Sequence, residues 1–371
     1  MNGYGNEKLQ KIQLRGTLKI CAAAVTLAAA TLLLYAAAAV FPNFVDDIYR
    51  PFSRAVLYGL SRATGWIPFS LAEILLYLIL LSVLTAVLRL AWVLIAGPKR
   101  AAYLARFAAW LLFYAALAVF LFCALWGLNY KAAPLAAELN LSVRPHSAAE
   151  LTELNRFLAD RANRCAALVA RDGDGGVAEF DFDAAAEKVA TEFSKETWRK
   201  EAPVKGVLAS KPMSYTQITG IFVPFTAEAN VNTNNVAVDL PFVMAHETAH
   251  RYAVAPEDEA NFYAFYILED AEDPLLAYSA ALAALRYCQN ALHAADYEAF
   301  AEIYGTYNEL VVGDLKAYSE HWQQYEGSVS EVSEAVNNTY LQVQGIEDGV
   351  KSYGRMVDLM LAWYDAKVLG R

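Results

Sequence analysis

Three long apolar stretches constrain the fold of this chain more than any other sequence feature. Residues 20–41 and 107–130 contain no charged side chain, and residues 67–96 contain only Glu73 and Arg89. About 20 apolar residues of helix are enough to cross a bilayer. A hydrophobic content of 57% and a positive mean hydropathy agree with this interpretation. We therefore predict three transmembrane helices, at about residues 20–41, 67–96 and 107–130.

Two local features of these stretches allow alternatives. Ala36 to Ala39 would suit a signal peptidase, but the apolar run is longer than a usual signal core, which favours a retained helix. Glu73 and Arg89 could form an intramembrane pair, or each could reach out to the nearer interface.

Basic residues beside the spans predict the orientation. They gather in the N-terminal tail and after the second span, and those between the first two spans are offset in part by Asp46 and Asp47. On the predicted cytoplasmic side the basic residues are Lys8, Lys11, Arg15, Lys19, Lys99, Arg100 and Arg106. The segment between the first two spans has Arg50, Arg54 and Arg62. We expect the N-terminus in the cytoplasm and everything after Tyr130 outside the cytoplasmic membrane. The net charge of −10, with no basic stripe beyond the membrane flanks, argues against nucleic acid as a partner.

The exterior part, residues 131–371, is predicted to be mainly helical with a small edge-strand sheet. The strand is expected at Ile218–Val223, because this stretch is rich in β-formers and Pro224 suits an edge. Apolar periodicity predicts helices at residues 148–171, 182–200, 240–253, 274–294, 297–325, 329–342 and 349–368. Cys165 and Cys288 could form a disulfide or remain buried thiols.

One pentapeptide carries the chemistry, and it lies on the helix predicted at 240–253. His246 and His250 are four residues apart around Glu247, so both imidazoles can reach one point on the same helix face. Zinc binds imidazole readily, and a catalytic site needs a third protein ligand and an open position for water. Glu247 is placed to act as general base on that water.

The third ligand is expected just after a turn at Pro256. Proline suits the start of a second helix, whose first turn would present Glu257; Glu259 is the alternative ligand. Asn261, one turn further, could hold the other ring nitrogen of a histidine. The histidines could instead satisfy only local hydrogen bonds.

Further candidates concern the substrate and the transition state. An exposed edge strand can pair with an extended peptide, and the segment after it could continue that edge, form the rim of the site or belong to an ordinary hairpin. The substrate-binding candidates in this segment are Phe225, Thr226, Ala227, Glu228, Ala229 and Asn230. Tyr340, Tyr353 and Arg355 are candidates for stabilising an oxyanion, with packing or surface pairing as the alternative.

Several motifs together resemble the DUF3810 family of bacterial membrane proteins. They are Trp66-Ile67-Pro68-Phe69-Ser70, Trp126-Gly127-Leu128-Asn129-Tyr130, the segment Pro224 to Asn232, His246 to His250, Glu257 to Phe262, Val336 to Leu341 and Asp348 to Arg355. A broader similarity is to gluzincin-type metallopeptidases, which implies Glu257 as zinc ligand and Asn261 as its supporter. The gap between His250 and Glu257 is short for gluzincins, and Ala253 stands where related membrane proteins often have glycine.

The sequence as a whole favours an enzyme: a zinc metallopeptidase with a membrane domain at 1–130 and a zincin-like domain at 131–371. Its partners would be the lipid bilayer and a peptide or protein substrate of the cell envelope. Alternatives are a non-catalytic membrane protein with a structural or vestigial zinc, and a protease-like envelope sensor. An intramembrane protease is disfavoured, because Asp239 and Arg251 flank the metal helix.

Overall fold

The computed structural model describes residues 3–97, 100–344 and 355–371, and the side chains from Leu14 onward. The described chain is mainly helical, as predicted, and divides into two compact units. The first unit comprises residues 1–53 and 71–131, and the second comprises residues 54–70 and 132–371.

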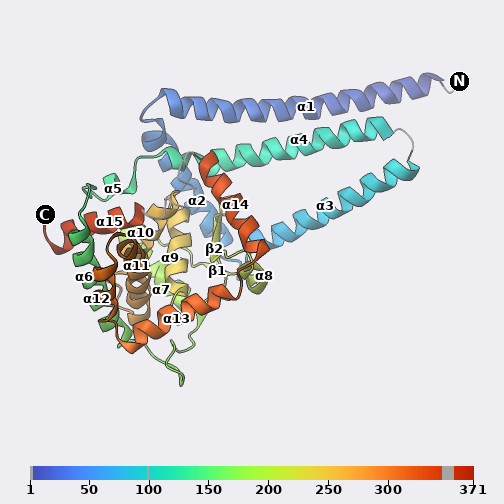
Figure 1. The fold of residues 1–371 in the computed structure, drawn as a ribbon. Helices are drawn as coiled ribbons and strands as arrows, with labels where there is room; N and C mark the ends of the chain where they lie inside the picture. Colours follow the sequence, from blue (N-terminus) through green and yellow to red (C-terminus); the bar gives the residue numbers. More distant parts are fainter. Residues whose placement is uncertain (1–2, 98–99, 345–354) are drawn as a thin grey trace. The chain divides into compact units, whose positions relative to one another are not determined.

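Three long helices dominate the first unit: α1 (Gly3–Val40), α3 (Leu71–Ala96) and α4 (Arg100–Leu125). Each contains a stretch that is long and apolar enough to span a membrane, which confirms the three predicted spans. Helix α1 packs along α4 (Figure 1). The second unit therefore belongs to a membrane-anchored chain.

The span boundaries differ from the prediction at two places. Helix α3 begins at Leu71 rather than at residue 67, after a non-helical segment that contains Pro68. Helix α4 begins at Arg100 and ends at Leu125, and a 3₁₀-helix, η2 (Gly127–Lys131), follows it. A short π-helix, η1 (Phe44–Tyr49), lies after α1.

Buried polar contacts tie these short elements to their neighbours in the first unit. The Tyr49 hydroxyl donates to the carbonyl of Cys123 (2.7 Å), and the amide of Asn129 donates to the Ser53 hydroxyl (3.0 Å). Of the two alternatives for Glu73 and Arg89, the intramembrane pair is not formed. The two residues are 16 positions apart on one helix, about 24 Å along its axis, and Glu73 instead accepts a hydrogen bond from Tyr77.

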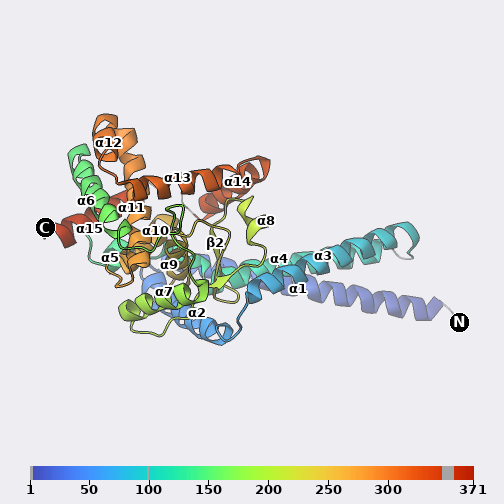
Figure 2. The same ribbon diagram turned by 90° about the horizontal axis from the view of Figure 1, so that it is seen from below.

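The second unit is built around two short helices, α9 (Leu240–Arg251) and α10 (Glu257–Leu268). Almost every side chain of both helices is buried, and larger helices pack around them (Figure 2). The surrounding helices include α6 (Ala148–Ala166), α7 (Phe182–Thr197), α11 (Pro274–Ala295) and α15 (Arg355–Trp363). The sequence analysis placed residues 54–70 with the membrane domain, but they cluster with this unit as the end of α2 (Arg50–Thr64) and the segment after it.

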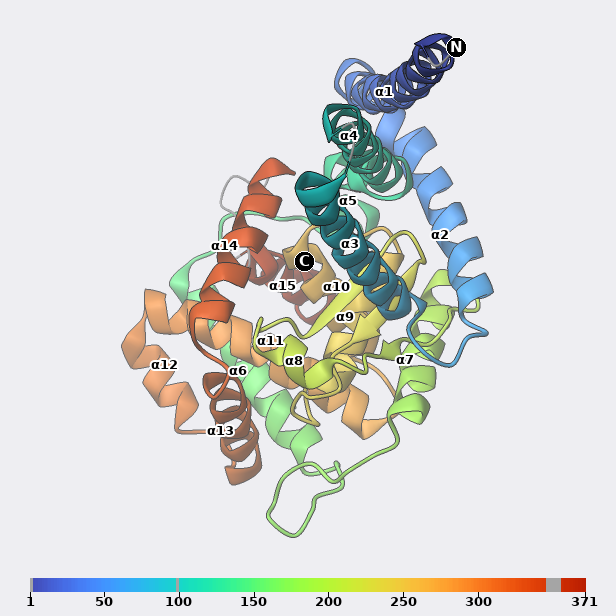
Figure 3. The same ribbon diagram turned by 90° about the vertical axis from the view of Figure 1, so that its right-hand side faces the viewer.

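A three-stranded sheet lies beside α9 (Figure 3). Its order is β1 (Lys205–Gly206), β3 (Glu228–Val231), β2 (Gly220–Val223), with β3 parallel to β1 and antiparallel to β2. Strand β2 is an edge strand, as expected. Of the options left open for the segment after β2, the hairpin is the one observed: the segment forms β3, which pairs antiparallel with β2, occupies the centre of the sheet and is buried along its length.

The remaining helices follow the predicted positions with one exception, and residues 349–354 of the last predicted helix lie outside the described residues. The helix expected at residues 297–325 is two helices, α12 (Tyr297–Tyr304) and α13 (Glu309–Gln323), because the Asn308 side chain caps a new helix by accepting from the N–H of Val311. The other short or C-terminal elements are α5 (Leu135–Glu138), α8 (Ser210–Ser214), α14 (Ser328–Val343) and the π-helix η4 (Tyr364–Val368). Cys165 and Cys288 are free thiols.

Candidate metal centre

A tight turn between α9 and α10 brings the predicted ligands together. Helix α9 ends at Arg251, and Ala253 then adopts the left-handed conformation, with φ of 65°. This conformation is strained for alanine and relaxed for glycine. Pro256 precedes the first residue of α10, so Glu257 faces back toward α9.

The donor atoms of His246, His250 and Glu257 form one cluster. The two Nε2 atoms are 3.1 Å apart, and the Glu257 carboxylate oxygens lie 3.2 Å from His246 Nε2 and 3.5 Å from His250 Nε2. Tetrahedral zinc with bonds of about 2.0–2.1 Å requires donor atoms about 3.3–3.4 Å apart. The three side chains therefore have the chemistry and the spacing that could hold such an ion.

The second ring nitrogen of His250 has a defined partner, but not the one predicted. His250 Nδ1 lies 2.8 Å from the carbonyl oxygen of Val254, in the turn after α9. A carbonyl can only accept, so Nδ1 carries a proton, and Nε2 is the ring nitrogen that faces the cluster. Val254 thus takes the supporting role expected of Asn261, which is buried on α10; His246 Nδ1 is buried without a hydrogen-bond partner among the described residues.

Glu247 is buried between α9 and the edge strand β2, with an exposed fraction of 3%. The backbone N–H of Phe222 donates to its carboxylate, and its Oε2 atom has no hydrogen-bond partner in the described structure. Burial raises the pKa of Glu247 to about 7, against the opposing effect of the two histidines. A carboxyl with this pKa can both accept and release a proton near neutral pH.

Gly220 makes this placement of Glu247 possible. A Cβ at position 220 would lie only 2.5 Å from Glu247 Oε1 and 2.6 Å from its Cγ. Only glycine lets the strand approach the carboxylate this closely. Sequence reasoning missed Gly220, although a glycine inside a predicted strand is a known signal of such an approach.

Opposite charges shift the pKa values of the remaining cluster members in opposite directions. Burial lowers the pKa of His250, but the Glu257 carboxylate outweighs it and the net effect raises the pKa to about 9. Burial alone would raise the pKa of Glu257, and the two histidines hold it well below its usual range. The Glu257 carboxylate therefore stays ionised and stabilises positive charge on the neighbouring imidazoles.

The other predicted site residues lie elsewhere. The Glu259 carboxylate accepts a hydrogen bond from the backbone N–H of Leu135 (2.9 Å), so it is not part of the cluster and Glu257 is the better ligand candidate. Tyr340 lies on α14, and Arg355 begins α15, where it partly offsets the rise that burial causes in the pKa of Asp258. Tyr353 lies outside the described residues.

Most of the predicted substrate-binding segment is buried. Phe225 is 44% exposed, whereas the five residues after it are buried: Thr226, Ala227, Glu228, Ala229 and Asn230. Glu228 pairs with Lys205, and Asn230 donates to the carbonyl of Ile221 across the sheet (3.2 Å). The polar residues of this segment therefore bind the sheet together, and β2 is the strand at its edge.

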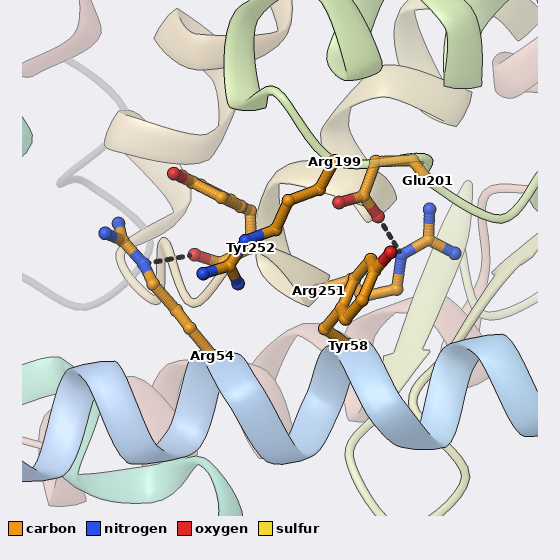
Figure 4. Close-up of a pocket in the computed structure, with 6 residues that line it drawn as sticks. All are labelled: Arg54, Tyr58, Arg199, Glu201, Arg251 and Tyr252. Carbon is orange, nitrogen blue, oxygen red and sulfur yellow. Dashed lines mark hydrogen bonds and ion pairs between the residues drawn. The ribbon is translucent and has the colours of Figure 1, made fainter.

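A buried ion pair holds the end of α9. Arg251, next to His250, lies 3.4 Å from the Glu201 carboxylate and donates to the carbonyl of Ala202 (Figure 4). Burial lowers the pKa of Arg251 and raises that of Glu201. Asp239 at the other end of α9 makes no capping hydrogen bond with its side chain, and its carboxylate pairs with Arg286 (3.0 Å).

A second group of possible ligands lies near the C-terminus. His146, Glu150 and Asp365 come close together, but Arg144 lies 2.6 Å from Glu150 and 2.5 Å from Asp365. This guanidinium already pairs with both carboxylates. The cluster on α9 and α10 is the stronger candidate for a metal.

Fold and site together define a membrane-anchored, mainly helical protein with an H-E-x-x-H helix. The chain belongs to DUF3810, a family of proteins of unknown function, whose model matches residues 45–361. This match confirms the family resemblance that the motifs suggested. No curated protein and no solved structure matched the chain.

Proposed function

We propose that this chain is a membrane-anchored zinc metallopeptidase with His246, His250 and Glu257 as metal ligands. The observation that supports this most is the spacing of the donor atoms of these three side chains: the two Nε2 atoms lie 3.1 Å apart, and each has one of the two Glu257 oxygens within 3.2 to 3.5 Å, close to the edge length of a tetrahedral zinc shell. A zinc ion bound there supplies a Lewis acid that polarises a carbonyl and acidifies water.

In this proposal the protein's own residues position and move the proton. Glu247 accepts the proton of the attacking water and passes it to the leaving amine. The N–H of Phe222 orients the carboxylate, and the buried Oε2 atom without a partner is the atom available to the water.

Strand β2 is the proposed docking edge for the substrate. The hydrogen bond from Phe222 to Glu247 indicates that the side of β2 not paired with β3 runs beside α9. An extended peptide that pairs with this edge would cross the metal cluster. The exposed side chains of Ile221 and Phe225 would then contact the peptide and contribute to specificity.

The location of the site defines the proposed substrates. The basic residues beside the spans favour a cytoplasmic N-terminus, and three crossings then put the second unit outside the cytoplasmic membrane. Envelope proteins, secreted peptides and peptidoglycan stem peptides are then accessible substrates. The first alternative, a structural zinc, would fill the fourth position with a protein side chain, whereas the described cluster has three members. The second alternative is a protease-like envelope sensor.

Two substitutions test the proposal on the full chain. Glu247→Gln should retain stoichiometric zinc and lose hydrolysis, while His246→Ala should lose zinc. His293→Ala, which removes an exposed imidazole on α11, is the matched control and should retain both properties. Peptidase activity that survives in Glu247→Gln refutes the assignment of the base.

A further inference from the structure

An open cavity of about 600 Å³ lies between the membrane helices α3 and α4. Its lining combines apolar surface with two arginines, Arg89 from α3 and Arg106 from α4, and includes Thr85 and Tyr103. The cavity lies wholly within the first unit and is separate from the metal cluster. Its volume falls in the range of cavities that bind small organic molecules.

The two arginines lie at similar distances along their helices from the segment that joins the end of α3 to the start of α4. Arg89 is seven residues before the end of α3, and Arg106 is six residues after the start of α4. At 1.5 Å per residue these offsets are about 10.5 and about 9 Å. The two guanidinium groups therefore approach the cavity from opposite helices at one level.

This level lies just inside the hydrocarbon region. A helix of 26 residues is about 39 Å long and exceeds a 30 Å hydrocarbon core by roughly 4 to 5 Å at each end. Both arginines then sit about 5 Å inside the boundary. An uncompensated guanidinium is costly there and requires an anion.

The protein supplies no such anion among the described residues. Neither Arg89 nor Arg106 has an ion pair with a described carboxylate, and the acidic residue of α3, Glu73, is about 24 Å from Arg89 along the helix. One arginine could reach outward to the interface alone. Here two arginines, one from each helix, line the same cavity, so a single anion can bind both guanidinium groups.

We infer that this cavity binds the phosphate group of an anionic lipid. A phosphodiester offers oxygens that two guanidinium groups can bind at once, and acyl chains match the apolar walls. The cavity opens between two helices that face lipid, so a lipid headgroup reaches it more directly than free phosphate. This site is independent of the proposed peptidase chemistry.

The test compares bound lipids on the full-length protein. The purified chain in neutral detergent is offered equal amounts of phosphatidylglycerol and phosphatidylcholine, and native mass spectrometry measures the ratio of the two lipids retained. Each of the two arginines that line the cavity should contribute roughly fivefold to the retention of the anionic lipid, so Arg89→Gln/Arg106→Gln should lower the ratio about 25-fold. Each single variant should lower it about fivefold, which keeps the test usable if the double variant fails to fold.

The matched control removes two other cations of the membrane unit. Arg15→Gln/Lys19→Gln takes the same charge from α1, outside the cavity, and should leave the ratio unchanged. An equal loss in this control, or no loss in the cavity variants, overturns the inference. Displacement of phosphatidylglycerol by millimolar inorganic phosphate, lost in the cavity variants, would assign the site to free phosphate and refute the lipid assignment.

Discussion

The contact between Gly220 and Glu247 yields the sharpest prediction about the candidate site. In Gly220→Ala the new Cβ would lie 2.5 Å from Glu247 Oε1, 2.6 Å from Cγ and 2.8 Å from Cδ. Ordinary contact begins near 3.4 Å, so the carboxylate or the strand must move by about 0.9 Å. Overpacking of this kind typically costs about 1–3 kcal/mol of folding free energy.

The effect on activity should exceed the effect on metal binding. Displacing a catalytic group by about 1 Å lowers the rate about 100-fold. Glu247 is not a proposed ligand, so the zinc dissociation constant should change by less than about twofold. Zinc affinity is measured by competition with a chelator, and hydrolysis by a quenched fluorescent peptide library, both on the full chain in detergent.

Gly313→Ala on α13 is the control, because a Cβ at that position meets nothing within 4 Å. It should retain stability, zinc and hydrolysis. Full stability and full activity in Gly220→Ala would contradict the packing of Glu247 against β2, and with it the role given to that strand.

Three further predictions concern other buried charges. Burial raises the pKa of Glu269 to about 7, so between pH 4.5 and 7 the folded state keeps the proton that the unfolded state releases. The free energy of unfolding should therefore fall over this range by up to about 3 kcal/mol, and Glu269→Gln should remove this loss. Denaturation midpoints at pH 5 and pH 8 measure the difference. Glu257→Gln should weaken zinc binding at least tenfold and Glu259→Gln should leave it unchanged, which chelator competition measures; equal losses would reopen the choice of ligand. Arg251→Met should lower the free energy of unfolding by about 3 kcal/mol, because it leaves the Glu201 carboxylate buried without its partner. Adding Glu201→Gln to this variant should restore part of the lost stability. An unchanged denaturation midpoint in Arg251→Met would refute the role of the pair.

Features encoded by local spacing were the ones that sequence could predict. The interval of four residues fixes His246 and His250 on one face of α9, and Pro256 fixes the start of α10. The three spans follow from uninterrupted apolar runs, because a membrane helix depends on its own length and hydropathy. The choice of Glu257 over Glu259 needed the structure, because it depends on how tightly residues 252–256 turn.

Features that depend on partners distant in sequence were missed. Asp239 has the residue type of a helix cap, but Arg286, 47 positions later, binds its carboxylate. Strand β3 is central because β1 pairs with its other side, and no pattern within residues 224–232 shows that partner. Residues 54–70 belong to the second unit through partners far along the chain, such as Thr226, whose carbonyl accepts a hydrogen bond from Thr64 (3.1 Å).

Zinc X-ray absorption spectroscopy on the full-length protein tests the central claim most directly. The account predicts one zinc per chain, bound by two imidazole nitrogens at about 2.0–2.1 Å, a carboxylate oxygen and one solvent oxygen. His246→Ala should remove an imidazole from this shell or abolish binding. A protein that takes up no stoichiometric zinc, or a shell completed by a fourth protein ligand, would contradict the proposed catalytic centre.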